Sequence, residues 1–144
     1  MKDVDKMPFV VDASITMAWC FEDENQDLAD YVLDMMRTDS AIVPQLWTYE
    51  VANVLVVASR KKRITESQAV YFMQLLGNMP ITIDDAGFEP TTLFTSGHSH
   101  GLTAYDAAYL CLSERLGIPL ATVDDNLKRA ATVAGVELLT SKTA

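Results

Sequence analysis

Short apolar segments alternate with longer amphipathic segments along the whole chain, and this alternation limits the fold more than any other feature of the sequence. Strands that alternate with helices form parallel sheets, and a strand that is covered on both faces has a short, continuous apolar sequence. The predicted strands are Phe9–Val11, Ala41–Val43, Ile81–Ile83 and Leu120–Val123, with Val136–Leu139 as a candidate edge strand. We therefore expect an α/β fold with a four- to five-stranded, mainly parallel sheet flanked by helices on both sides.

The segments between these strands have the apolar spacing of helices. Thr103–Leu116 is the clearest and ends before Gly117, whereas Thr65–Gly77 opens with a Thr65 and Gln68 capping box. The remaining predicted helices are Ala13–Phe21, Asn25–Arg37, Gln45–Arg60, Phe88–Gly97 and Asn126–Ala134. No linker or repeat interrupts the pattern, and 144 residues suit one domain. We expect its core to run from about residue 8 to residue 139.

The acidic charge of the chain is concentrated in one segment. The formal net charge is −9, but residues 22–39 alone hold seven acidic residues against one arginine. The one dense cationic cluster is Arg60, Lys61, Lys62 and Arg63. This cluster could contact an RNA backbone, or it could complement the dipole at a helix end. The overall charge argues against tight nonspecific binding to nucleic acid but does not exclude an RNA substrate.

Apolar runs in this chain are too short for a membrane span. The longest, Val54–Ala58, is far below the roughly 20 residues that a membrane helix needs. The N-terminal segment mixes both charge signs and lacks the basic-then-apolar order of a signal peptide. We expect a cytoplasmic protein.

Acidic residues stand where the predicted helices begin. Asp12 follows the first strand, Asp124 follows the fourth, and Asp106 lies in the first turn of Thr103–Leu116. The carboxyl ends of parallel strands meet at one edge of a sheet, and ligands bind at that edge. Each acid also has a structural interpretation, because Asp is a favoured helix cap. Asp125 could replace Asp124 as the cap, and Thr103 with Asp106 resembles a capping box.

Glu50 lies in a predicted helix that is apolar on most faces. A buried carboxylate needs a partner charge, a metal ion or a raised pKa, and no Lys or Arg lies within one turn of Glu50. Asn53 shares its helix face and could orient it. Several acids at one edge would repel one another unless a divalent cation lay among them, and oxygen ligands suit Mg²⁺ or Mn²⁺. Such an ion activates water, so the pattern favours phosphodiester hydrolysis.

Four segments of the sequence resemble the PIN-domain ribonuclease family, and most closely its single-domain VapC-like toxins. The matching segments are residues 11–14, 50–55, 102–110 and 120–124, and the similarity extends from Phe9 to about Leu139. The resemblance implies one PIN-like domain over residues 1–144. It implies an acidic quartet around Mg²⁺ or Mn²⁺, made of Asp12, Glu50, Asp106 and Asp124. It also matches three supporting polar residues, Ser14, Asn53 and Thr122.

The same resemblance implies an activity and partners. The family's activity is metal-dependent endoribonuclease cleavage by an activated water, as the toxin of a toxin–antitoxin pair. The expected partners are RNA, a VapB-like antitoxin and a second copy of the chain. Two alternatives stay open: a PIN-like binding module without activity, and a receiver-type phosphoacceptor domain, which Asp84 and Asp85 alone favour. The choice between Asp124 and Asp125 as the fourth ligand also stays open.

Overall fold

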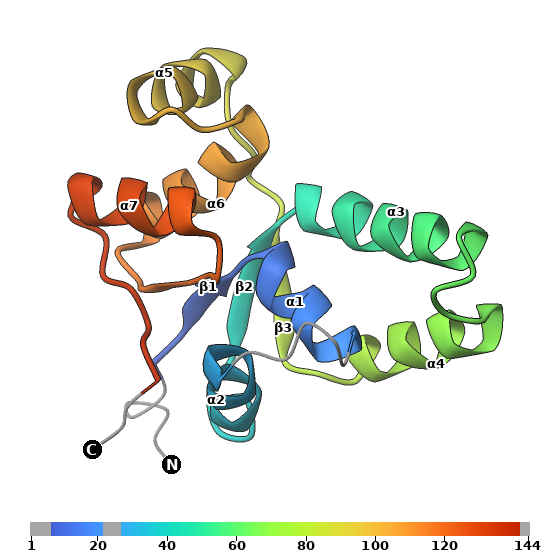
Figure 1. The fold of residues 1–144 in the computed structure, drawn as a ribbon. Helices are drawn as coiled ribbons and strands as arrows, with labels where there is room; N and C mark the ends of the chain where they lie inside the picture. The colour runs from blue at the N-terminus through green and yellow to red at the C-terminus, as the bar shows by residue number, and fades with distance from the viewer. Residues whose placement is uncertain (1–6, 22–26, 142–144) are drawn as a thin grey trace.

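Four parallel strands form the centre of the computed structural model, which describes residues 7–21 and 27–141. The strands are β1 (Phe9–Val11), β2 (Ala41–Pro44), β3 (Ile81–Asp84) and β4 (Leu120–Ala121). They lie in the order β3-β2-β1-β4, and all three pairings are parallel (Figure 1). The prediction of a mainly parallel α/β sheet is confirmed.

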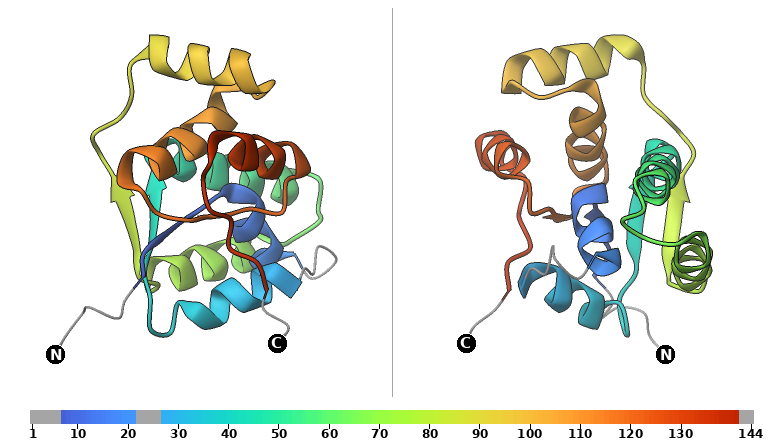
Figure 2. Two further views of the ribbon diagram at one scale, coloured as in Figure 1. Left: turned by 90° about the vertical axis from the view of Figure 1, so that its left-hand side faces the viewer. Right: turned by 45° about the vertical axis from the view of Figure 1, so that its right-hand side comes forward.

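Seven helices surround this sheet in the described part of the chain. They are α1 (Ala13–Cys20), α2 (Asp27–Met35), α3 (Leu46–Arg60), α4 (Glu66–Gly77), α5 (Pro90–His100), α6 (Ala104–Leu116) and α7 (Asp125–Ala134). Helix α6 packs on β1, β2 and β4, whereas α3 packs on β2 and on α1. The hairpin of α3 and α4 lies at the opposite end of the molecule from α7 (Figure 2). All three residues of β1 are buried, so both faces of the sheet centre are covered.

Several boundaries differ from the sequence prediction for local physical reasons. Strand β4 ends at Ala121, and the candidate fifth strand is reduced to a single bridge between Leu120 and Leu138. Helix α5 begins and ends later than predicted, because Pro90 stands in its first turn and Gly101 closes it in the left-handed conformation. The start of the predicted helix Asn25–Arg37 lies outside the described residues.

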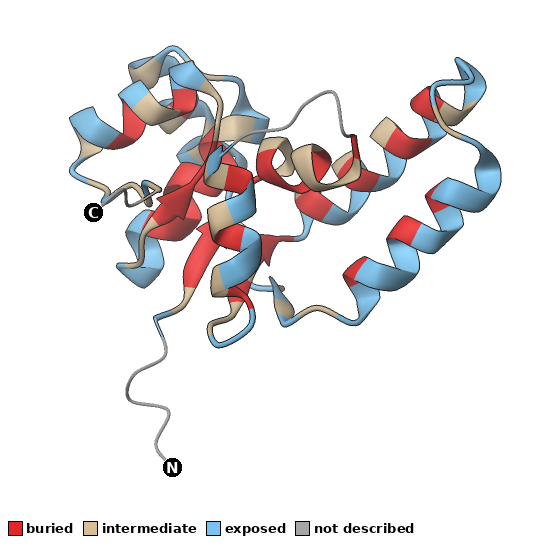
Figure 3. Ribbon diagram, turned by 60° about the horizontal axis from the view of Figure 1, so that its bottom comes forward, coloured by how far each residue is buried: buried red, intermediate tan, exposed pale blue. Residues whose placement is uncertain are grey.

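Helix α6 is the central helix of the core. Every residue from Ala107 to Ser113 is buried, and Tyr109 is the largest fully buried side chain among the described residues. Figure 3 shows buried strands at the centre and exposed outer faces on α3 and α4. No helix in residues 7–21 and 27–141 is long and apolar enough to cross a membrane.

Candidate active site

Asp12 leaves the end of β1 and becomes the N-cap of α1. Its side chain is buried, and its Oδ1 accepts hydrogen bonds from the Ser14 hydroxyl (2.7 Å) and the Ile15 backbone N–H (3.1 Å). Its Oδ2 accepts a short hydrogen bond from the Thr122 hydroxyl. Two of the three predicted supporting residues, Ser14 and Thr122, therefore hold Asp12 in place.

The segment after β4 is tied to the segment after β1 through the same two hydroxyls. Ser14 Oγ accepts from the Val123 backbone N–H at 3.1 Å, and Thr122 Oγ1 accepts from the Asp124 backbone N–H at 3.0 Å. Both bonds lie beyond Ala121, the last residue of β4. They also bring Asp124 to the edge where Asp12 lies, although the two are more than 100 positions apart in the chain.

Asp124 rather than Asp125 is the N-cap of α7. One oxygen of Asp124 accepts from the Leu127 backbone N–H at 2.8 Å, whereas Asp125 is exposed as the first residue of the helix. The capping interpretation of Asp12 and Asp124 is thus correct, and it coexists with their position at the sheet edge. At the start of α6, the Thr103 hydroxyl accepts from the Asp106 N–H at 3.1 Å. Among the described contacts, the Asp106 carboxylate accepts no hydrogen bond from the Thr103 backbone N–H, so the capping box is only half formed and does not occupy this carboxylate.

Glu50, on the first half of α3, has a partner that the sequence did not indicate. The Tyr109 hydroxyl of α6 donates a hydrogen bond of 2.6 Å to Glu50 Oε1. The available signal was a tyrosine in a buried helical run, since a buried hydroxyl needs a partner. Asn53 is exposed and makes no hydrogen bond to Glu50 among the described contacts. Its supporting role stays a prediction.

The carboxylates affect one another through space, and Asp106 lies at the centre of these interactions. Burial, together with a smaller effect of the Asp106 charge, raises the pKa of Asp12 to about 6 despite the opposing effect of its hydrogen bonds. Burial and the charge of Asp106 also raise the pKa of Glu50, against the Tyr109 hydrogen bond. Burial and the charge of Asp124 raise the pKa of Asp106. Asp106 thus interacts electrostatically with each of the other three predicted acids.

The family follows from the sequence match over this same region. The PIN domain family matches residues 9–133, which contain all four strands, all four acids and nearly all of α7. This chain belongs to the PIN domain family. Membership and the strand order rule out the receiver-type alternative, whose sheet has the order 2-1-3-4-5. Asp84, which had favoured that alternative, instead forms a salt bridge with Arg115.

Known PIN-like relatives cover almost the whole chain. Ribonuclease VapC3 of Pyrobaculum aerophilum is 29% identical over 123 residues, which are 84% of this chain and 92% of the relative. The crystal structure of PAE2754 from Pyrobaculum aerophilum shares 22% identity with a TM-score of 0.65, covering 87% of this chain and 86% of the other. A chain of VapBC2 from Rickettsia felis, bound to a DNA fragment from their promoter, shares 14% identity with a TM-score of 0.65. That match covers 92% of this chain and 98% of the other. The solved structures show that the fold is shared.

The chemistry of the site in this PIN domain fits a divalent cation. Neither of the salt bridges between described side chains, Arg37–Asp34 and Arg115–Asp84, involves any of the four acids. Within residues 7–21 and 27–141, neither of these salt bridges offsets the repulsion among the acids. No three His, Cys, Asp or Glu side chains among the described residues converge closely enough to form a ready-made metal site. A bound cation would draw the carboxylates closer together, and all of its side-chain ligands would be oxygens.

The basic cluster of the PIN domain lies at the far end of α3 from Glu50. Arg60 is the last residue of α3, Lys61 is its C-cap, and Lys62 has a positive φ of 60° in the turn before α4. Ten residues of helix separate Glu50 from Arg60, which corresponds to roughly 15 Å. The Arg63 guanidinium lies 3.8 Å from the centre of the Phe21 ring. Arg60 is therefore too distant from Glu50 to neutralise it.

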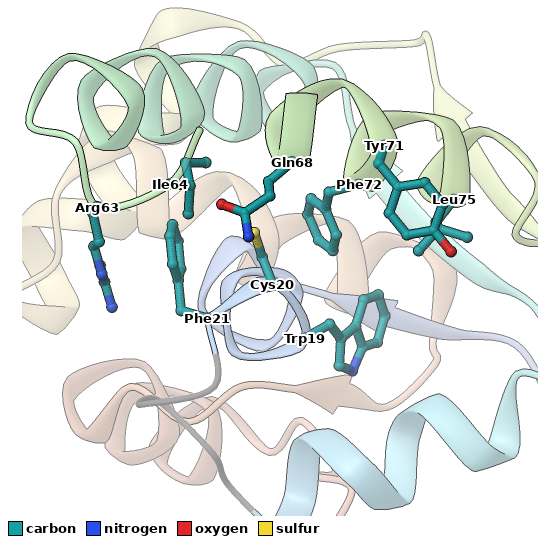
Figure 4. A pocket seen from close by; sticks show the side chains of 9 residues that line it. All are labelled: Trp19, Cys20, Phe21, Arg63, Ile64, Gln68, Tyr71, Phe72 and Leu75. Carbon is teal, nitrogen blue, oxygen red and sulfur yellow. The ribbon is translucent and has the colours of Figure 1, made fainter. Parts of the chain in front are cut away.

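One cavity of the PIN domain, lined by both apolar and polar side chains, is separate from the acids. It lies between α1 and α4, has a volume of about 510 Å³, and is shown in Figure 4. Its lining residues are Trp19, Cys20, Phe21, Arg63, Ile64, Gln68, Tyr71, Phe72 and Leu75. The Trp19 ring N–H donates to the Ala29 carbonyl at 2.8 Å, which ties α1 to α2 beside the cavity. None of the four acids lines this cavity. The protein therefore has two distinct surfaces, which are the cavity and the acidic edge formed by Asp12, Glu50, Asp106 and Asp124.

Proposed function

We propose that this PIN domain is a Mg²⁺- or Mn²⁺-dependent endoribonuclease that acts in the cytoplasm as the toxin of a toxin–antitoxin pair. The observation that carries the proposal is the electrostatic coupling of Asp106 to Asp12, Glu50 and Asp124 without a basic side chain among them. Similarity to a protein named Ribonuclease VapC3 supports the reaction class. The folded PIN domain alone would equally suit a binding module, but such a module has no need to gather four acids.

The four carboxylates have distinct parts in holding the cation. Asp12 is held by three hydrogen bonds, so its oxygens keep one orientation. Asp124 uses one oxygen to cap α7, which leaves the other oxygen for a cation. A bound divalent ion supplies an activated water and positive charge beside the scissile phosphate. The residues that would hold it are Asp12, Glu50, Asp106 and Asp124.

Single-stranded RNA is the substrate that we propose for this site. Sequence-specific cleavage of RNA requires unstacked bases, which single strands and loops offer. Because the net charge is −9, attraction of the RNA backbone has to be local. We propose that Arg60, Lys61, Lys62 and Arg63 contact the backbone a few nucleotides away from the bond that is cleaved.

We propose a VapB-like antitoxin as the partner of the cavity between α1 and α4. The structurally similar chain from Rickettsia felis is part of VapBC2. The cavity exposes aromatic and aliphatic side chains, with Tyr71 63% and Leu75 45% exposed. Apolar exposure of this kind marks protein interaction sites. A segment of antitoxin with large apolar side chains would fill it.

We propose that the free protein is a homodimer. Outward-facing apolar residues on α3 support an interface there, since Tyr49 is 74%, Val56 43% and Val57 37% exposed. Light scattering of the purified chain measures the mass directly. A Val56→Asp and Val57→Asp variant should shift a dimer to monomer, whereas a wild type that is monomeric at all concentrations contradicts the proposal.

The activity is tested with purified protein that is free of any antitoxin. Labelled single-stranded RNA should be cleaved with Mn²⁺ or Mg²⁺ and remain intact with EDTA. Sequencing the 5′ ends of RNAs that accumulate after induction in cells would identify the cleaved bond. A fully folded wild type that cleaves no RNA with either metal would contradict the proposal and support the inactive binding module.

A further inference from the structure

Tyr109 is a polar group in the most buried part of the molecule. Its residue is 1% exposed, and its hydroxyl lies 2.6 Å from Glu50 Oε1. Leu110 and Leu112 on the same helix are fully buried as well, and their side chains have no polar atom. Burying a hydroxyl carries a desolvation cost that a phenylalanine of nearly the same shape would avoid. Packing alone therefore does not account for the hydroxyl.

The hydroxyl joins two of the elements that form the acidic edge. Tyr109 lies on α6 three residues after Asp106, so the two side chains are neighbours on one helix surface. Glu50 comes from α3, and no other hydrogen bond reaches its carboxylate among the described residues. The position of the Glu50 carboxylate relative to Asp106 thus depends on a bond that α6 itself supplies.

We propose that Tyr109 is a positioning residue for the cation site: it holds Glu50 Oε1 and leaves Oε2 as the oxygen that binds the ion. The inference rests on the proposed metal-dependent function and deepens it. Residues that hydrogen-bond a metal ligand fix its orientation, and their loss typically weakens metal affinity 10- to 100-fold. The hydroxyl contacts neither RNA nor the ion in this arrangement; it acts through Glu50.

The test is Tyr109→Phe, with Mn²⁺ affinity measured by isothermal titration calorimetry in the absence of RNA. We expect the variant to bind Mn²⁺ about tenfold more weakly than wild type. The matched control is Tyr105→Phe, which removes the hydroxyl of an exposed tyrosine one turn earlier on the same helix. The control should bind Mn²⁺ as wild type does. In RNA cleavage, Tyr109→Phe should need more metal for half-maximal rate while keeping most of the rate at saturating metal.

A double-mutant comparison separates positioning from a general structural role. In a Glu50→Ala background, Tyr109→Phe should cause no further loss of Mn²⁺ affinity, because the ligand that it positions is gone. Thermal unfolding in EDTA shows whether each variant is folded.

Two outcomes would overturn the inference while leaving the proposed function intact. They are a folded Tyr109→Phe variant with wild-type Mn²⁺ affinity, and an equal tenfold loss when Glu50 is already alanine. A wild type that binds Mn²⁺ but cleaves no RNA would overturn the proposed function alone, and the role of Tyr109 would be judged from the titrations. A wild type that binds no Mn²⁺ would overturn both.

Discussion

The acidic edge and the cavity between α1 and α4 break the usual rule of burial in opposite directions. At the edge a carboxylate is buried, since Asp12 is only 4% exposed. Beside the cavity apolar rings and chains are exposed, Tyr71 at 63% and Leu75 at 45%. Positions that break local rules without a gain in stability are expected at functional sites. The comparison supports our proposal that the two surfaces bind different ligands.

The two surfaces also differ in how they are built. At the edge, directional hydrogen bonds from Ser14, Thr122 and Tyr109 orient the Asp12 and Glu50 carboxylates, although the acids do not yet converge on one point. The cavity is lined by side chains of α1, of α4 and of the turn before α4, and it combines aromatic and aliphatic groups with the polar groups of Arg63 and Gln68. In our proposal, a cation would relieve repulsion at the first surface, whereas an apolar partner would remove exposed area from water at the second.

The largest expected effect is that of Asp106→Asn, which should abolish the function of the acidic edge and leave that of the cavity intact. Asp106→Asn should lower metal-dependent RNA cleavage at least about 100-fold, because the central charge of the site is lost. The measurement is the cleavage rate of a labelled single-stranded RNA at fixed Mn²⁺. Asp85→Asn, at an exposed position on the loop after β3, is the matched control and should keep wild-type activity. Asp106→Asn should still bind the antitoxin; loss of that binding would contradict the separation.

The converse variant should damage the cavity and spare the edge. Tyr71→Ala combined with Leu75→Ala should weaken antitoxin binding about tenfold or more. A few large side chains, aromatic ones above all, often contribute most of the binding energy of an interface. Surface plasmon resonance against the cognate antitoxin measures this effect. RNA cleavage by the free variant should match that of wild type. Wild-type antitoxin affinity in the variant would show that the partner binds elsewhere.

The dependence of stability on pH tests whether burying the ionised Asp12 carboxylate destabilises the metal-free protein. Because burial raises the pKa of Asp12 to about 6, the folded state binds a proton more readily than the unfolded chain. The metal-free protein therefore loses stability as the pH rises from about 4 to 6, by up to roughly 3 kcal/mol. In urea denaturation at pH 8 in EDTA, the free energy of unfolding of Asp12→Asn should exceed that of wild type by about 1–2 kcal/mol. At pH 5 the difference in unfolding free energy should be smaller. Mn²⁺ should stabilise wild type only, and a less stable variant at pH 8 would contradict this account.

The smallest expected effect concerns the basic cluster. Replacing Lys61 and Lys62 with alanine should weaken RNA binding by about three- to tenfold and reduce its dependence on salt. Filter binding at several salt concentrations with metal-free protein measures both changes. Arg37→Ala is the control, since this exposed residue pairs only with Asp34 among the described side chains. Unchanged affinity would leave the cluster as a helix end that complements the dipole.

Local patterns in the sequence determined the elements and three of the edge positions. The apolar run Phe9–Val11 predicts β1 without error, and the capping box at Thr65 is formed as predicted. Asp12 directly after β1 and Asp124 three residues after the end of β4 both cap helices, so their place at the carboxyl edge follows from topology. Such signals lie within three or four residues of one another, and this is why the sequence reveals them.

Only the tertiary structure decided how the acids are held. The bonds of Thr122 to Asp12 and of Tyr109 to Glu50 join residues 110 and 59 positions apart. The sequence interpretation of Asn53 as the partner of Glu50 missed the second of these bonds. Contacts of this kind depend on how helices and strands pack against one another. No short pattern records that packing, because each side chain meets its partner only after the elements between them have folded.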